Sequence, residues 1–260
     1  DFYKNNFGRT GIYNDGVGVK SIVHVTFRSQ GPATGGNAAW YGAPNKFMAY
    51  GLGTSSWYPV VAIDVAGHEM THGVTEATAG LAYSNDAGGL NEASSDIMGT
   101  MVEFFANNAA DTPDYMIGEK IYRSNPTGKT ALRYMFLPGA ADGNRSYNCY
   151  PAGGLTGVDP HYSSGPGNHF FYLLAEGAVS PSGFSYTPAQ LVCNGDTGVT
   201  GIGRDAAQRI YYRALTVYFT SSETYPQARA HTLQAAADLY GSGSTQYNAV
   251  ARAWSAVNVN

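Results

Sequence analysis

The feature that most constrains this chain is the segment His68-Glu69-Met70-Thr71-His72, an H-E-x-x-H motif. On a helix, residues four apart share a face, so both imidazoles can reach one metal ion while Glu69 lies beside them. Two unconnected surface histidines are the alternative, but with six histidines in 260 residues the motif rarely arises by chance. A catalytic zinc site needs a third protein ligand and keeps a fourth position for water.

A second predicted helix, residues 91–107, offers that ligand. Most of its residues are apolar, which indicates burial, yet it carries Glu92, Asp96 and Glu103 at spacings of four and seven. These spacings align the three carboxylates on one stripe of the helix. Buried ionised carboxylates are costly unless cations or hydrogen-bond donors accompany them. The stripe therefore predicts contact with a partner that supplies such groups.

The first helix has a matching stripe of residues four apart, Asp64, His68 and His72. Antiparallel packing of the two stripes predicts that Glu92 lies near His72 and completes a His-His-Glu zinc site. The same packing puts Asp96 near His68, where it can accept a hydrogen bond from the far ring nitrogen and orient the ligand.

At the other end of the stripes, Asp64 and Glu103 repel each other unless a cation lies between them. Hard carboxylate oxygens favour calcium over zinc. Asp114 and Glu119 follow in the adjoining segment and could add ligands. Solvated surface carboxylates are the alternative reading, and for Asp114 and Glu119 taken alone it is the better one.

The predicted elements separate strands from helices along the chain, which favours an α+β fold with two lobes. Residues 1–78 form the remainder of a β-rich lobe that ends in the H-E-x-x-H helix, and residues 79–260 form a mainly helical lobe. Asp205 is expected to cap one helix and Gly241 to end another. The expected strands are 21–26, 37–41 and 46–50, the helices are 60–75, 91–107, 163–177, 205–219, 225–240 and 244–257, and long loops fill 125–167.

Composition excludes several classes of protein. Charged residues make up 13% of the chain and the net charge is −4, so there is no basic surplus for nucleic-acid binding. The apolar runs fall short of the roughly 20 residues of a membrane span. The chain opens on Asp1-Phe2-Tyr3 without a methionine or signal pattern, which indicates a processed or trimmed product.

The two cysteines, Cys149 and Cys193, lie in Gly- and Asn-rich surroundings that suit a disulfide between loops. Two free buried thiols are the alternative. A disulfide implies an oxidising compartment and therefore a secreted protein.

With these motifs, the sequence resembles the thermolysin family of secreted zinc endopeptidases, the gluzincin type, over essentially the whole chain. A glutamate twenty residues after the second histidine of H-E-x-x-H makes the resemblance specific. The matching stretches are Ile63 to His72, Thr78-Ala79-Gly80-Leu81, Leu90 to Ile97, Gly201-Ile202-Gly203-Arg204-Asp205 and Tyr212-Arg213-Ala214-Leu215-Thr216.

The resemblance implies roles that the residues alone leave unassigned. Tyr83 and His161 resemble the groups that stabilise the oxyanion, Asp159 the carboxylate that orients the histidine, and Arg133 the arginine that holds a substrate carbonyl. His169 is a competitor for the role of His161, but its apolar helix favours a packing role. The remaining implied positions are the substrate-pairing edge strand at Asn37 and Ala38, the walls of an apolar pocket at Val65, Ile117, Ile121 and Leu132, and a calcium-binding carbonyl at Met116.

The chain also departs from the family pattern. Relatives carry further β-sheet before the point where this chain begins, so an N-terminal segment is expected to be missing. Met116 stands where some relatives have an acidic residue, and Lys129 lies near a carboxylate that serves another calcium in some relatives. One calcium ion is therefore expected, together with one zinc ion. The expected partners are polypeptide substrates and an inhibitory propeptide or the missing segment, with a monomeric chain.

The function implied is zinc-dependent hydrolysis of internal peptide bonds, with Glu69 as general base and a hydrophobic residue preferred after the scissile bond. Two alternatives stay open. One is an aminopeptidase with the same zinc motif, which would need a site for the substrate's free amine. The other is a poorly active autolytic fragment that binds zinc and peptide.

Overall fold

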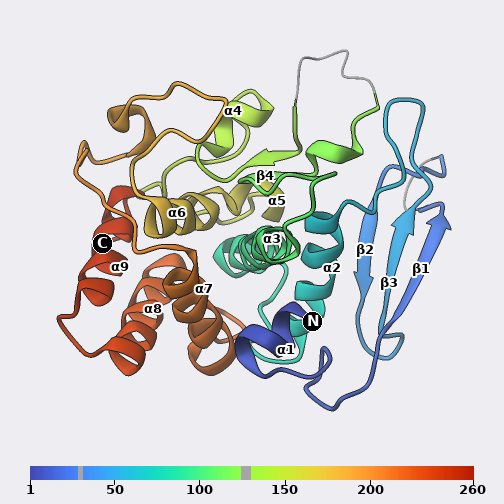
Figure 1. Ribbon diagram of the computed structural model, residues 1–260, viewed down its shortest axis with the longest axis horizontal. Coiled ribbons are helices and arrows are strands. Elements are labelled where there is room, and N and C mark those ends of the chain that lie inside the picture. Colours follow the sequence, from blue (N-terminus) through green and yellow to red (C-terminus); the bar gives the residue numbers. More distant parts are fainter. Residues whose placement is uncertain (29–31, 124–129) are drawn as a thin grey trace.

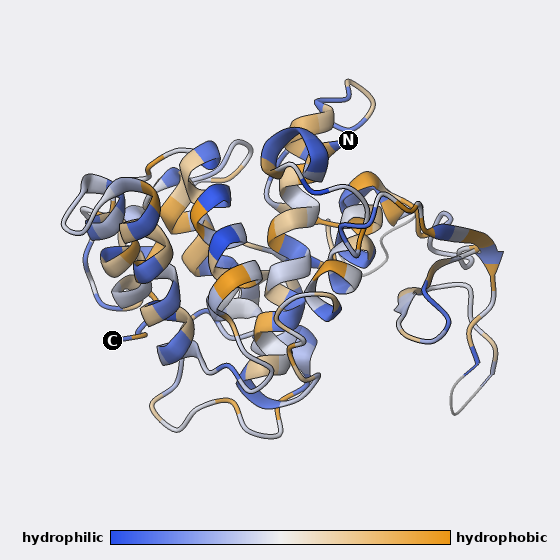
Figure 2. Ribbon diagram, turned by 90° about the horizontal axis from the view of Figure 1, so that it is seen from below, coloured by the Kyte–Doolittle hydropathy of each residue, from blue (hydrophilic) through white to orange (hydrophobic). Residues whose placement is uncertain are grey.

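The computed structural model describes residues 1–28, 32–123 and 130–260. A small sheet lies on one side of a larger group of helices (Figure 1), and the view from below separates the two parts again (Figure 2). The α+β architecture with two lobes is therefore confirmed. Within the described ranges, no helix is both long enough and apolar enough to cross a membrane.

The three strands expected near the N-terminus form one sheet in the order β1-β3-β2. They are β1 (Lys20–Val25), β2 (Ala38–Tyr41) and β3 (Phe47–Gly51). β1 runs parallel to β3, whereas β2 pairs with β3 in the antiparallel sense. In the part of the chain that the structure describes, β1 and β2 are thus the two edges of the sheet.

Helix α2 (Ile63–Glu76) lies between the sheet and helix α3 (Asn85–Ala106), which is seen end-on at the centre of Figure 1. Glycines let the two helices approach closely. A Cβ atom on Gly67 would lie 2.9 Å from the Cα of Gly99, and one on Gly99 would lie 2.5 Å from the carbonyl oxygen of Asp64. The close crossing brings the side chains of α2 and α3 within reach of one another.

Helix α3 begins six residues before the predicted residue 91, at Asn85. Gly88 and Gly89 lower the helix propensity of this segment, so its sequence does not indicate a helix. Tertiary packing favours the helix here, because the glycines allow close contact with another segment. A Cβ atom on Gly89 would lie 2.5 Å from the carbonyl oxygen of Ser163. The glycines leave room for the short helix α5 (Pro160–Ser163).

The other predicted helices are present. They are α6 (Gly165–Glu176), α7 (Arg204–Arg213) with a π-helical turn over Ala214–Tyr218, α8 (Tyr225–Tyr240) and α9 (Thr245–Ala256). Gly241 ends α8 as expected. The expectation that Asp205 caps α7 is wrong, because the helix already begins at Arg204, and Asp205 instead pairs with Arg209 one turn later.

Several short elements have no clear sequence signal. The predicted loop 125–167 contains β5 (Arg133–Tyr134), α4 (Pro138–Asp142) and α5, while its residues 125–129 lie outside the described ranges. β5 pairs with β4 (Met116–Ile117). α1 (Phe2–Phe7) and the 3₁₀ turns Glu119–Ile121 and Pro188–Leu191 are likewise not predicted from the sequence. Elements of two to six residues show too little periodicity to be recognised.

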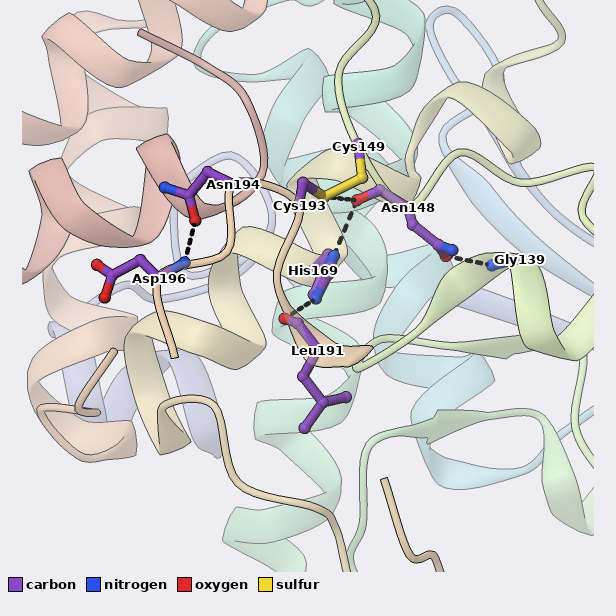
Figure 3. The surroundings of a disulfide bond; sticks show 8 residues. All are labelled: Gly139, Asn148, Cys149, His169, Leu191, Cys193, Asn194 and Asp196. Atoms are coloured by element: carbon purple, nitrogen blue, oxygen red, sulfur yellow. Dashed lines mark hydrogen bonds between the residues drawn. A yellow bond between two sulfur atoms is a disulfide. The ribbon is translucent and has the colours of Figure 1, made fainter. Parts of the chain in front are cut away.

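The predicted disulfide between Cys149 and Cys193 is present and joins two loops of the helical lobe (Figure 3). His169 lies beside it, with ring nitrogens 2.8 and 2.9 Å from the carbonyl oxygens of Asn148 and Leu191. Burial holds the pKa of His169 below its ordinary value. His169 is thus a buried packing residue that ties the two loops together.

Candidate active site

Three side chains from α2 and α3 converge on one point. Nε2 of His72 lies 2.9 Å from Nε2 of His68 and 3.3 Å from Oε1 of Glu92. Nε2 of His68 lies 3.5 Å from Oε2 of the same carboxylate. That Oε2 atom is buried and has no hydrogen-bond partner among the described residues. Two imidazoles and a carboxylate with an unsatisfied oxygen fit a zinc ion.

Each histidine of this group is oriented through its other ring nitrogen. Nδ1 of His68 lies 2.8 Å from Oδ1 of Asp96, as the matching stripes predict. Nδ1 of His72 lies 2.7 Å from Oδ1 of Asn91, whose amide nitrogen donates to the carbonyl oxygen of Leu81. Asn91 has no role predicted from the sequence, although its position next to Glu92 is a usable signal. Such outer partners direct the Nε2 atoms toward a metal.

The histidines and Glu92 stabilise one another's charged forms. Burial alone would raise the pKa of Glu92, but His68, His72 and His161 outweigh it and lower that pKa well below its ordinary value. Burial tends to lower the pKa of His72, yet hydrogen bonding and charge from Glu92 raise it to about 9. In the metal-free protein, the carboxylate thus stabilises positive charge at the place where a cation would bind.

Asp96 connects this group to Arg133. Its Oδ2 atom accepts from Nε of Arg133 at 2.7 Å and from Nδ2 of Asn168 at 2.8 Å, and its Oδ1 accepts from Nη2 of Arg133 at 2.7 Å. Asn168 is not predicted from the sequence as a site residue. Arg133 reaches the site because β5 pairs with β4, and its Nη2 atom lies 4.0 Å from Oε2 of Glu92.

Two further residues that are far apart in the chain also meet at Glu92. The hydroxyl of Tyr83 donates to Oε1 of Glu92, and Nε2 of His161 lies 3.7 Å from the same oxygen. Nδ1 of His161 lies 2.8 Å from Oδ1 of Asp159. Asp159 also caps α5, so that short helix places His161 beside Tyr83, with Nε2 and the hydroxyl 3.5 Å apart. The three residues that the resemblance implied are therefore brought together.

A cleft of about 510 Å³ joins the metal-binding group to the edge strand β2, and Asn37, Ala38, Glu69 and Tyr83 are among its lining residues. The carbonyl oxygen of Asn37 accepts from the backbone nitrogen of Gly51 at 2.8 Å. Hydrogen-bonded and non-hydrogen-bonded pairs alternate along an antiparallel ladder. The backbone groups of Ala38 and Trp40 therefore point away from β3, toward the open edge.

Some of the residues expected to form the walls of an apolar pocket pack together. Val65 and Ile121 are buried in a small cluster against which Leu132 and Ala38 pack. Ile117 lies next to Leu132, whose backbone nitrogen donates to its carbonyl oxygen, but its side chain packs in the large core of the helical lobe.

A separate group of acidic residues forms a second candidate metal site. Carboxylate oxygens of Glu103, Asp111 and Glu119 all lie within 4.8 Å of one another. Asp64 lies against this group, and its Oδ2 atom accepts from the backbone nitrogen of Gly118. Among the described residues, one oxygen each of Asp64, Glu103 and Asp111 and both oxygens of Glu119 are buried without a hydrogen-bond partner.

Burial, and then the charge of Asp64, raises the pKa values of Glu103 and Glu119 in the metal-free protein. Burial also raises the pKa of Asp64 to about 6, although hydrogen bonds from Gly118 and Val65 oppose it. Oδ1 of Asp111 also lies 3.6 Å from Nζ of Lys120, so one lysine offsets part of the negative charge of this group. The clustered carboxylate oxygens fit a hard cation such as calcium.

The membership of this acidic group differs from the sequence prediction. Asp111 belongs to it without having been predicted, although it lies in the same acidic segment. Asp114 is outside the group of three and accepts from the backbone nitrogen of Met116 at 2.6 Å. Met116 itself pairs with Tyr134 in the β4–β5 ladder. Lys129, one of the residues from which a single calcium ion was predicted, lies outside the described residues.

Comparison with known proteins points to one family of metallopeptidases. Residues 1–76 match the family model described as thermolysin metallopeptidase, catalytic domain, and residues 79–259 match the one described as its alpha-helical domain. A solved structure of the precursor of protealysin, a metalloproteinase from Serratia proteamaculans, superposes with a TM-score of 0.73 at 27% identity. That match covers 100% of this chain and 74% of the other.

Curated relatives match over the whole of this chain. A transglutaminase-activating metalloprotease from Streptomyces mobaraensis is 48% identical over 259 residues, and bacillolysin from Bacillus cereus is 43% identical over 262 residues. Thermolysin from Alicyclobacillus acidocaldarius is 40% identical over 261 residues. The chain spans 32%, 42% and 43% of these three proteins, respectively. With both family models matched in sequence order, the chain belongs to the thermolysin family of metallopeptidases.

Proposed function

We propose that this chain is a zinc-dependent endopeptidase that cleaves internal bonds of extended polypeptides. The observation that carries the proposal is the convergence of His68, His72 and Glu92 beside the buried carboxylate of Glu69, in a cleft bordered by an open strand edge. When bound, zinc supplies a Lewis acid that acidifies water and polarises the scissile carbonyl. The protein's own residues perform the remaining tasks.

Glu69 is the proposed general base. It takes a proton from the attacking water and passes it to the nitrogen of the leaving amine, so the same carboxylate acts as base and then as acid. Its burial, with 6% of the residue exposed, keeps bulk water away from this proton. Because Glu69 follows His68 directly on α2, the helix fixes the base beside the metal-binding group.

Tyr83 and His161 are the proposed donors to the carbonyl oxygen as it gains negative charge. Burial and the charge of Glu92 raise the pKa of Tyr83, so its hydroxyl keeps its proton. Asp159 holds the ring of His161 by its Nδ1 atom, which leaves Nε2 facing the cleft.

Substrate is proposed to lie along β2 in an extended conformation and to pair with the outward backbone groups of Ala38, beside Asn37, which also lines the cleft. Arg133, held by Asp96, would bind a substrate carbonyl beyond the scissile bond. Val65, Ile121 and Leu132, with Ile117 behind them, would receive a hydrophobic side chain just after that bond. This arrangement favours an endopeptidase, because β2 is an edge strand in the described part of the chain and can pair with the middle of an extended substrate.

One calcium ion is proposed for the group of Asp64, Glu103, Asp111 and Glu119, because its unsatisfied oxygens match the ligands that calcium prefers. The sequence also predicts Asp114 and the carbonyl of Met116 as ligands, but Asp114 lies outside the converging group and accepts from the backbone nitrogen of Met116. A secreted, monomeric protein is proposed as well, and the disulfide supports an oxidising compartment. The proposed partners are polypeptide substrates and an inhibitory propeptide.

The test is hydrolysis of casein and of an N-terminally blocked peptide by the purified chain, with and without a chelator and after zinc is restored. The proposal expects cleavage of both substrates, loss with chelator and recovery with zinc. Failure on the blocked peptide alone would favour an aminopeptidase. Zinc and peptide binding without turnover would favour a poorly active autolytic fragment instead.

A further inference from the structure

The carboxylate of Glu76, the last residue of α2, lies in a cradle built from three other segments. Its Oε2 atom accepts from Nε1 of Trp40 at 2.7 Å. Its Oε1 atom accepts from the backbone nitrogen of Ala43 at 3.0 Å and from the hydroxyl of Tyr13 at 3.3 Å. Three donors on one exposed carboxylate are more than a freely solvated surface glutamate has.

Two glycines leave room for this arrangement. A Cβ atom on Gly42 would lie 2.2 Å from Oε2 of Glu76, so a side chain there would displace the carboxylate. A Cβ atom on Gly73 would lie 3.1 Å from Cε2 of Trp40, so Gly73 lets the indole pack directly on α2. Gly42 thus leaves room for the carboxylate of Glu76, and Gly73 leaves room for both Ile12 and Trp40 on the surface of α2.

The contact joins the two walls of the cleft. Glu76 follows His68 and His72 at the same spacing of four residues on α2, each step advancing along the helix by about 6 Å. Trp40 belongs to β2, and its outward backbone groups are available to an extended substrate. Both residues line the cleft. One helix therefore carries the metal-binding histidines and also holds the strand beside which the substrate lies.

We infer that Glu76 is a positioning residue for substrate binding, which acts through Trp40 to hold the edge of β2 at a fixed distance from the metal-binding histidines. This inference rests on the proposed endopeptidase function. A peptide long enough to pair with Trp40 needs the strand in place, because β2 has a paired neighbour on one side only in the described part of the chain. A short substrate that does not reach Trp40 does not need the strand to be held in place.

The test compares Glu76→Ala, Glu76→Gln and Trp40→Phe with the unaltered zinc-loaded chain on a series of blocked peptides of increasing length. Losing one or two of these hydrogen bonds should lower kcat/KM for the longest peptide about tenfold, mostly through KM, and for the shortest less than about twofold. Glu76→Gln, which keeps one acceptor oxygen, should retain part of the activity. The double variant Glu76→Ala/Trp40→Phe should be no worse than the poorer single variant.

Asp238→Asn is the matched control. Asp238 also accepts from several donors, Arg213, Tyr218 and Gln234, but lies on α8 away from the cleft, so the variant should keep the length dependence unchanged. Thermal unfolding of every variant reports whether the chain still folds.

Three outcomes would overturn the inference: equal losses on short and long peptides, additive losses in the double variant, or a change confined to peptides with a cationic side chain. The last would mean that Glu76 binds substrate by its charge. Absence of any cleavage by the unaltered chain would instead count against the proposed function.

Discussion

Asp96 and His68 are joined by a hydrogen bond of 2.8 Å between two side chains that are both buried, and the same carboxylate accepts two further hydrogen bonds from Arg133. Burial disfavours the charge of Asp96, but Arg133 and His68 outweigh it and hold the pKa of Asp96 below its usual range. One carboxylate therefore fixes a proposed zinc ligand and a proposed substrate-binding arginine at once.

Replacement of Asp96 by Asn should weaken zinc binding by about 10- to 100-fold, as is common for partners of metal-bound histidines. The reason is that the neutral amide of Asn accepts a weaker hydrogen bond from His68 than the charged carboxylate of Asp96 does. Zinc affinity is measured by competition with a chromogenic chelator.

The matched control for this prediction is Glu223→Gln. Glu223 is fully buried, its Oε1 lies 2.6 Å from Nδ1 of His231, and neither residue lines the cleft. The Glu223→Gln variant should lower the free energy of unfolding without changing the affinity for zinc. Equal weakening by both variants would show that the effect is general destabilisation.

Replacement of Glu69 by Gln should abolish peptide hydrolysis while zinc content stays near one ion per chain. The amide cannot take the proton of the attacking water, but Glu69 is not among the three converging metal-binding residues. Steady-state rates and metal analysis of the same sample check the prediction. Full activity of this variant would contradict the assignment of the general base.

Replacement of Asp111 by Asn should remove most of the stabilisation by calcium, because it takes one charge from the group of converging carboxylates. For the unaltered chain, calcium at about 100 times its Kd should add about 2.7 kcal/mol to the free energy of unfolding. Thermal unfolding with calcium and with a calcium chelator measures the difference.

Asp114→Asn is the paired variant, since Asp114 is already engaged with the backbone of Met116. It should keep the response to calcium. A loss equal to that of Asp111→Asn would instead make Asp114 a ligand, as the sequence predicts.

Without calcium, the contribution of Asp64 to stability should fall as the pH rises. Its pKa is about 6 in the folded chain against an ordinary value of 3.8, so the folded state binds more protons between these values. A shift of about two pKa units corresponds to about 3 kcal/mol, present below pH 4 and lost as the pH passes 6. Unfolding of the unaltered chain and of Asp64→Asn in chelator, from pH 4 to 8, measures the difference. A gap that does not change with pH would refute the prediction.

Replacement of Gly99 by Ala should destabilise the protein by about 1–3 kcal/mol, because the added Cβ would lie 2.5 Å from the carbonyl oxygen of Asp64 and push α2 away from α3. It should also weaken zinc binding, since the zinc ligands lie on both helices. Gly153→Ala adds the same atom at an exposed position with nothing within 4 Å and should do neither. Chemical denaturation compares the two variants.

Much of the metal-binding group follows from local sequence. Helical periodicity is a short-range property, so the spacing of His68, His72, Glu92 and Asp96 is enough to place them on facing stripes. The same reasoning predicts that Asp64 meets Glu103. It cannot include Asp111, because that residue follows the end of α3 in a segment without periodicity.

The sequence by itself therefore determined the presence of the long helices, their buried polar stripes and the ligand chemistry that those stripes can support. Tertiary structure decided which distant groups join them: His161 and Tyr83, 78 residues apart, both reach Glu92, and Glu76 holds Trp40 across the cleft. Short elements and close glycine contacts set these distances. Their geometry depends on packing between segments, which no repeating pattern along the chain encodes.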